Sequence, residues 1–256
     1  MIVSRPFVCV LAFTAFGCGH AAGTHPSDMS AAEHQAAAKQ ESLSADHHAS
    51  QFDPAATAEG RSTCGGALDG GDTNLWLGVC WTELVNPTEE HRRQAERHRE
   101  LAAKHRAAAT ALAEAEARAC EGIAEIDRDM SPFSHRADIR SVSELWDNSA
   151  PDPARSSNHP AGATVTLNAV PGLTKEWLQR LVSCHLARNA SVGHDMPEMP
   201  YCPLVPKGTT AEVRSVDGGF AVDIRAEDSG ATAEIVRRAQ ALRNAPAKAA
   251  ATSTSP

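Results

Sequence analysis

The segment from residue 88 to residue 126 constrains the fold of this chain most strongly, because it contains no proline and its first glycine is Gly122. Most of its residues are Ala, Glu, Arg, Lys or Gln, which have high helix propensity. Asn86-Pro87 in front of it is typical of a helix start. We therefore predict one long helix that ends near Ile126, and such a helix must bury one face against another element.

Three histidines recur at intervals of seven residues along this segment. Alternating steps of three and four residues place His91, His98 and His105 on the same stripe as Leu101 and Leu112. The stripe continues with the small residues Ala108, Ala115 and Ala119. This pattern is typical of a face that packs closely against an antiparallel helix.

The partner helix is predicted at residues 31–48, which are rich in Ala, Gln, Lys and Glu. Ser30 and Glu33 in front of it match the pattern of a capping box. Three residues of this second helix also recur at intervals of seven, namely His34, Glu41 and His48. An antiparallel alignment of the two helices predicts three facing pairs, which are His34–His105, Glu41–His98 and His48–His91.

These facing pairs admit more than one chemical interpretation. Residues seven apart on one helix are separated by about 10.5 Å along its axis, which is too far to share an ion. Two imidazoles from facing helices could hold Zn²⁺, Cu²⁺ or Ni²⁺, with water completing the coordination shell. Alternatively, the histidines are half-exposed groups that titrate near about pH 6 to 7 without a ligand, or they never face a partner helix. The sequence alone favours histidines without a metal.

Residues 162–243 show a different period, which predicts a small α+β domain. A strand pattern at 164–170 is followed by a helix that Thr174 caps, then by a β-hairpin, and then by a final helix at 231–243. This β-α-β-β-α order makes up most of a ferredoxin-like domain. The usual last strand is missing, and residues 139–146 could supply a fourth strand.

The chain begins MIVSRPFVCVLAFTAFGCGHAAG, which has the form of a secretion signal. Arg5 precedes an apolar run at residues 7–17 that is too short to span a bilayer but suits a signal peptide. The Gly17-Cys18 junction resembles the lipobox of bacterial lipoproteins.

This resemblance implies that the signal is cleaved before Cys18 and that lipid, such as palmitate, is attached to this cysteine. Two or three acyl chains hold a protein stably on a membrane. Gly19 stands where inner-membrane lipoproteins carry aspartate, which implies the outer membrane, facing the periplasm. The alternative is cleavage after Ala22 or Gly23 and secretion as a soluble protein.

The chain contains seven cysteines, and removing the signal and lipidating the lipobox cysteine leaves five. An extracytoplasmic location permits disulfides. The simplest assignment is two local disulfides, Cys64–Cys80 and Cys184–Cys202, which close short loops. Cys120 would then be a small buried apolar residue. Connectivity cannot be deduced from spacing, so other pairings stay open.

A second cluster of chemically interesting residues spans positions 184–202. It contains the potential soft-metal ligands His185, His194, Met196 and Met199, a set that suits Cu(I). We favour a structural role, in which the disulfide ties down a proline-rich loop and the methionines fill its apolar underside. His194-Asp195 could form half of an acid–base pair, but the chain has no GxSxG, HExxH, P-loop or GxGxxG motif to complete a catalytic site.

The net charge of −8 makes this chain a poor candidate for nucleic-acid binding, because such binding depends on cationic contacts to phosphate. The expected fold class is α+β, with an N-terminal antiparallel Ala-rich helical hairpin and a small C-terminal ferredoxin-like domain. The expected layout is a signal peptide (1–17), a lipidated cysteine and polar tether (18–29), a helical hairpin with a disulfide loop (30–130), a linker (131–161), the α+β domain (162–243) and a disordered tail (244–256).

Three functions are compatible with these features. The favoured one is a lipid-anchored cell-envelope protein that binds or scaffolds other envelope proteins and needs no cofactor. The second is a periplasmic lipoprotein that binds copper or zinc, which the twelve histidines support. The third is an enzyme without a recognisable motif.

Overall fold

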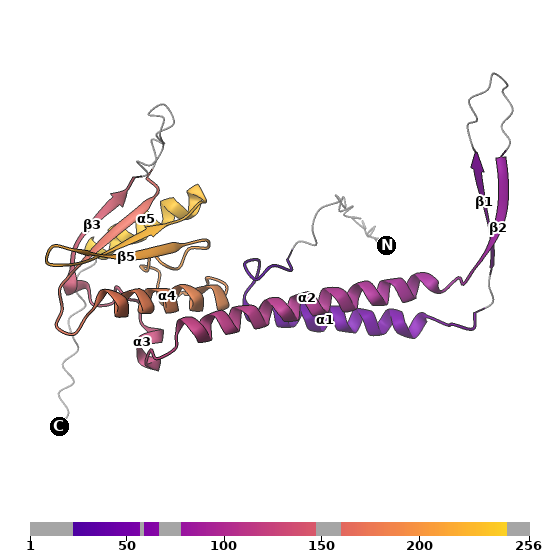
Figure 1. Cartoon of the computed structure of the whole chain (residues 1–256), viewed down its shortest axis with the longest axis horizontal. Helices are drawn as coiled ribbons and strands as arrows, with labels where there is room; N and C mark the ends of the chain where they lie inside the picture. Colours follow the sequence, from indigo (N-terminus) through magenta and orange to yellow (C-terminus); the bar gives the residue numbers. More distant parts are fainter. Residues whose placement is uncertain (1–22, 57–58, 67–77, 147–159, 245–256) are drawn as a thin grey trace, which may run out of the picture.

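The computed structural model describes residues 23–56, 59–66, 78–146 and 160–244. It is a mixed α+β protein with one four-stranded antiparallel sheet (Figure 1). The elements are α1 Ala31–Gln51, β1 Glu59–Gly66, β2 Gly78–Val85, α2 Glu89–Ala119, α3 Glu125–Asp129, a 3-10 turn η1 Arg136–Asp138, β3 Ile139–Leu145, β4 Gly162–Asn168, α4 Lys175–Ser191, β5 Thr210–Val216, β6 Gly219–Arg225 and α5 Ser229–Asn244. The predicted signal peptide, the predicted lipidation site Cys18 and residues 245–256 of the predicted tail lie outside the described residues.

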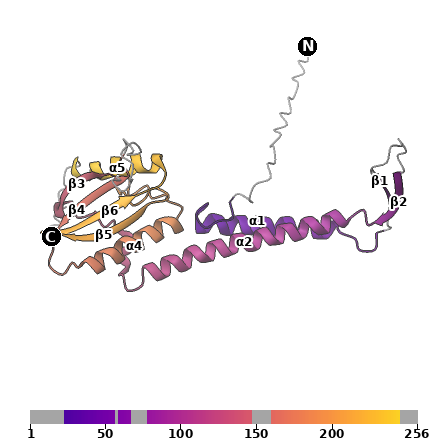
Figure 2. The ribbon, with the colours of Figure 1, turned by 45° about the horizontal axis from the view of Figure 1, so that its top comes forward.

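Helices α1 and α2 lie side by side in antiparallel orientation, and we call this pair the arm (Figures 1 and 2). The capping box at the start of α1 is present, since Ser30 Oγ accepts from Glu33 N at 3.2 Å and a Glu33 carboxylate oxygen accepts from Ser30 N at 2.8 Å. The buried apolar residues of α1 and α2 are mostly alanines: Ala38, Ala45, Ala95, Ala102, Ala108, Ala109 and Leu112. Small side chains let the two backbones approach closely.

Helix α2 ends at Ala119, earlier than the expected end near Ile126. Gly122 follows with a φ of +72°, in the left-handed region that terminates helices. The chain then turns into the short helix α3, so the apolar residues after Ala119 belong to a corner and not to the arm.

Strands β1 and β2 form a separate two-stranded antiparallel sheet at the end of the arm that is remote from the large sheet (Figures 1 and 2). The register places Cys64 directly opposite Cys80. The predicted Cys64–Cys80 disulfide is compatible with this register, but the side chains of both residues lie outside the described part of the chain.

The large sheet has the strand order β3-β4-β6-β5, with every neighbouring pair antiparallel. The segment expected to supply a fourth strand is β3, and it occupies the edge beside β4. Alternate residues of the central strands, such as Val165 and Val222, join one buried cluster with Val182 of α4 and Ile235 of α5. We call β3 to α5, together with Phe133, which joins the same cluster, the sheet domain.

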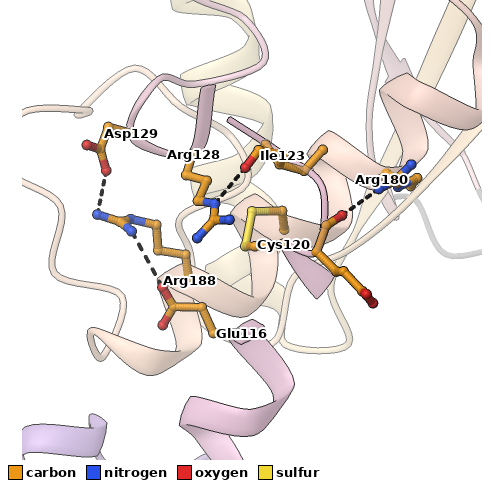
Figure 3. Close-up of a disulfide and its surroundings, with 9 residues drawn as sticks. Glu116, Cys120, Ile123, Arg128, Asp129, Arg180 and Arg188 are labelled. Atoms are coloured by element: carbon orange, nitrogen blue, oxygen red, sulfur yellow. Dashed lines mark hydrogen bonds and ion pairs between the residues drawn. A yellow bond between two sulfur atoms is a disulfide. The ribbon is translucent and has the colours of Figure 1, made fainter. Parts of the chain in front are cut away.

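A disulfide between Cys120 and Cys184 joins the end of α2 to α4 (Figure 3). The predicted Cys184–Cys202 disulfide is therefore wrong, and so is the expectation that Cys120 is unpaired. Adjacent helical residues point about 100° apart, so Cys184 faces the end of the arm while its neighbour His185 faces Cys202, which is a buried free thiol.

Polar contacts surround this disulfide and fix the arm to the sheet domain (Figure 3). Arg188 of α4 bridges two carboxylates, Glu116 of α2 at 3.5 Å and Asp129 of α3 at 2.5 Å. The Arg180 guanidinium donates to the backbone carbonyl of Glu121. Because these contacts come from three helices, they set the angle at which the arm leaves the domain.

Candidate functional site

The arm contains three polar pairs that cross from α1 to α2, and we call them rungs. The inner rung joins His34 Nδ1 to His105 Nδ1 at 3.1 Å. The middle rung joins Glu41 Oε2 to His98 Nδ1 at 2.6 Å, and the outer rung joins His48 Nδ1 to His91 Nδ1 at 3.2 Å. These are the pairs that the seven-residue spacing predicts, and each rung consists of one residue from each helix.

The protonation pattern of the inner rung follows from its hydrogen bonds. His34 Nε2 lies 3.0 Å from the backbone carbonyl of His25, which can only accept, so Nε2 carries the proton. In neutral His34 the Nδ1 atom is then an acceptor, and His105 Nδ1 is the donor. Both side chains are buried, and His34 is 0% exposed, so this bond satisfies polar groups that would otherwise lie unpaired in the interior.

The middle rung pairs a carboxylate with an imidazole. Glu41 can only accept when it is ionised, so His98 Nδ1 donates to it. Both side chains keep about a quarter of their surface exposed, at 25% for Glu41 and 23% for His98. Solvent screening therefore limits the energy of this pair to about 1 kcal/mol, and its main effect is to orient the His98 ring.

The outer rung lies in a cluster of four histidine rings near the remote end of the arm. The rings of His48 and His98 are stacked at 5.4 Å with an interplanar angle of 8°, and those of His48 and His91 lie 5.5 Å apart. His47 is the fourth ring, 5.8 Å from His48. Partial burial, followed by the neighbouring rings of His98 and His91, lowers the pKa of His48. The unprotonated form of His48 is therefore favoured in the fold.

Several other charged residues of α2 form ion pairs within the helix. Examples are Arg92 with Glu89 and Glu96, and Lys104 with Glu100. These exposed pairs contribute little stability. Among the described residues, the polar side-chain contacts between the two helices are the rungs and a 3.3 Å contact from Arg106 to Ser42.

The second predicted cluster does not converge on one point. His185 lies against the Cys202 sulfur at 3.3 Å, and Ser131 Oγ donates to the same sulfur at 3.2 Å. His194 instead has a positive φ of 62° and donates from Nδ1 to the Val205 carbonyl at 2.8 Å.

The methionines of this cluster have a packing role. Met196 and Met199 are buried in the hydrophobic cluster of the sheet domain. Asp195 is exposed, beside a His194 ring whose Nδ1 is already bound. The described structure therefore does not bring the proposed soft-metal ligands together at one site. It also gives the proposed acid–base pair at His194 and Asp195 no further partner among the described residues.

Burial dominates the electrostatics around Cys202. It lowers the pKa of His185 to about 4 and raises the pKa of the Cys202 thiol. Both groups are therefore neutral at pH 7, and a neutral thiol is a poor nucleophile. His185 Nδ1 has no hydrogen-bond partner among the described residues. Sequence reasoning missed the contact with Ser131, which lies 71 residues away from Cys202.

Comparison of the chain with protein-family models, with curated proteins and with solved structures finds no match. Within the described ranges, no group of three or more His, Cys, Asp or Glu side chains is positioned to hold a metal ion. In the same ranges, no helix is both long and apolar enough to cross a membrane.

Proposed function

We propose that this chain is a lipid-anchored cell-envelope protein whose arm and sheet domain form a binding or scaffolding module. The observation that carries the proposal is the shape of the chain, in which the arm separates the β1–β2 sheet from the sheet domain (Figures 1 and 2). Helix α1 has 21 residues, and at 1.5 Å per residue it extends over about 30 Å. Such a molecule can contact two components at once.

The contacts of the first described residues support a membrane attachment close to the start of α1. The Asp28 carboxylate accepts from the backbone N–H groups of Gly23 at 3.1 Å and His25 at 2.9 Å. The His25 carbonyl in turn accepts from His34 of α1. Cys18 precedes Gly23 by five residues, which span at most about 18 Å. A lipid on Cys18 would therefore hold the start of α1 near the bilayer surface.

The remote end of the arm has properties that suit a partner. Among the described residues, β1 and β2 pair with each other in a two-stranded sheet, and an edge strand of this kind can accept a further strand. Leu84 on β2 is 73% exposed, so it offers an apolar side chain beside these edges. We propose that a second envelope protein binds there.

We infer that the fold of the sheet domain is a permuted ferredoxin-like sheet. The order β3-β4-β6-β5 supports this, because β3 lies at the edge where a split βαβ unit would place its last strand. The arm is, by the same inference, the antiparallel Ala-rich hairpin that the sequence predicts. This architecture has many functions in other proteins and indicates none by itself.

The anchor is tested by changing Cys18 to Ala in the full-length gene. Detergent-phase partitioning and metabolic labelling with an alkyne palmitate analogue would be measured for both forms. We expect the native chain to enter the detergent phase with label and the C18A chain to lose both properties. Equal partitioning and labelling of the two forms would contradict the proposal.

The binding role is tested with a photo-crosslinking residue at position 84. Position 212 on β5 is the matched control, because Glu212 is an exposed strand residue of the sheet domain. We expect a discrete crosslinked species from position 84 that is absent from position 212. Crosslinking from position 212 alone, or from neither position, would contradict a partner at the end of the arm.

A further inference from the structure

We propose that the outer rung, His48 and His91, is a binding site for one divalent transition-metal ion, either Cu²⁺, Ni²⁺ or Zn²⁺. The two Nδ1 atoms serve as neighbouring ligands and water completes the shell. This inference does not depend on the lipid anchor or on a partner at the β1–β2 sheet, and it assigns a ligand to the arm itself.

The distance between the two nitrogens agrees with such a site. Zn²⁺ binds imidazole nitrogen at about 2.0–2.1 Å, so two ligands about 100–110° apart at the ion have nitrogens about 3.1–3.4 Å apart. The observed distance between His48 Nδ1 and His91 Nδ1 is 3.2 Å. An N–H···N hydrogen bond has a similar length, so the surroundings of the rung must distinguish the two interactions.

The surroundings favour the outer rung over the inner rung. His34 and His105 are buried, so water cannot complete a metal shell there, and burying a divalent ion with two neutral ligands is costly. His48 and His91 are only partly buried. Water can therefore occupy the remaining positions of an ion held between them, which is the usual state of an open metal site.

Neighbouring groups hold the ligands in position. His98 stacks on His48, and Glu41 accepts a hydrogen bond from His98, so a carboxylate fixes the ring that packs against the ligand. This packing limits the rotation of the His48 ring. Among the described residues no third protein ligand is in place, so the ion would be held by two imidazoles with exchangeable water.

The test is metal binding by the full chain, purified in detergent without an affinity tag. Titration calorimetry with CuCl₂, NiCl₂ and ZnCl₂ would be combined with paramagnetic resonance of the Cu²⁺ form. We expect one ion per chain, tightest binding for Cu²⁺ as the general order of affinities requires, and coupling of the copper signal to two nitrogens.

Variants assign the site. His91→Gln should lower the affinity for the metal at least about tenfold, because changes in the outer shell alone already lower it about 10- to 100-fold. The glutamine amide can still form a hydrogen bond with His48, so the two helices should stay paired. His135→Ala, which removes an exposed histidine outside the arm, should leave binding unchanged. Circular dichroism would verify that the helix content is preserved.

Several results would overturn the proposal. These are no binding by the native chain, full binding by a correctly folded His91→Gln variant, or loss of binding only when His34 and His105 are changed. The state of the lipid anchor is measured separately by phase partitioning, so failure of this site and failure of the anchor are distinguishable.

Discussion

The arm and the sheet domain are stabilised in different ways. The sheet domain buries large side chains, among them Phe133, Leu178 and Ile235, each nearly or fully inaccessible. The arm buries mainly alanines, whose methyl groups contribute about 0.8 kcal/mol each at most. Small side chains interlock weakly, so apolar packing specifies the alignment of α1 and α2 poorly.

The rungs provide the missing specificity in the arm. A shift of one helix by seven residues would place Glu41 opposite His91 or His105 and would leave one buried histidine without its partner. An unpaired buried polar group costs about 1–3 kcal/mol. Large apolar residues therefore determine how the domain packs, whereas polar pairs determine the register of the arm.

The largest expected effect is in the domain. Phe133→Ala should lower the free energy of unfolding of the sheet domain by about 3–5 kcal/mol, because it leaves a cavity at a fully buried site. Denaturant unfolding monitored by near-ultraviolet circular dichroism would measure this change. The arm offers a matched control in Ala102→Gly, which should cost only about 1 kcal/mol. Equal losses from the two changes would contradict the contrast between the regions.

Removing the disulfide should separate the two regions. Its loop has a sequence separation of 64 residues, for which the chain-entropy model gives about 4 kcal/mol. With Cys120→Ser and Cys184→Ser together, we expect lower stability and two resolved thermal transitions for the arm and the domain. Calorimetry would record them. A single transition at an unchanged temperature would show that the other contacts at the junction are sufficient to hold the arm and the sheet domain together, and it would contradict this prediction.

Acid should destabilise the sheet domain through His185. Its pKa in the fold is about 4, below the ordinary value of 6.5, so the folded state favours the neutral ring. Above about pH 6.5 the ring is neutral in both the folded and the unfolded state, so its protonation costs no stability there. As the pH falls to 4, the unfolded state takes up a proton that the folded state does not, and the free energy of unfolding falls by about 3 kcal/mol in total. Cys202 and Arg188 are the neighbouring groups.

The measurement is the free energy of unfolding across this pH range. His185→Gln should be less stable than the native chain at pH 7 but should show a flatter dependence on pH. If the variant and the native chain lose stability in parallel, the titration belongs to other groups.

The inner rung should give the smallest of these effects. His105→Ala leaves the buried His34 Nδ1 without its partner, with an expected cost of about 1–3 kcal/mol to the arm. Hydrogen exchange of α1 amides would report it. Replacing both histidines by Leu should restore part of the stability while weakening the register. A Leu pair with unchanged register would refute the role assigned to this rung.

Sequence reasoning predicted the parts of the fold that depend on local periodicity. The rungs follow from a repeat of seven on two helices. The edge strand β3 corresponds to the possible fourth strand predicted at residues 139–146. The docking of α4 on the end of α2 depends on contacts between residues such as Cys120 and Cys184, which are distant in the chain. No local pattern encodes that choice, so proximity in sequence favoured the wrong cysteine pair.

The contact between His185 and Cys202 was hidden for a related reason. Spacing alone indicated a disulfide or a metal set in residues 184–202, whereas tertiary burial turned the two residues toward each other as neutral groups. The rung geometry could be predicted, but the exposure that distinguishes the outer rung from the inner one could not.

The register of the arm is tested most directly by disulfide trapping at the middle rung. Glu41 and His98 would both be replaced by cysteine, and the crosslink would be located by peptide mass spectrometry after mild oxidation. A second variant with cysteines at positions 41 and 91 is shifted by one repeat. We predict an intramolecular crosslink between positions 41 and 98 and none between 41 and 91. Efficient crosslinking of the shifted pair would contradict the account.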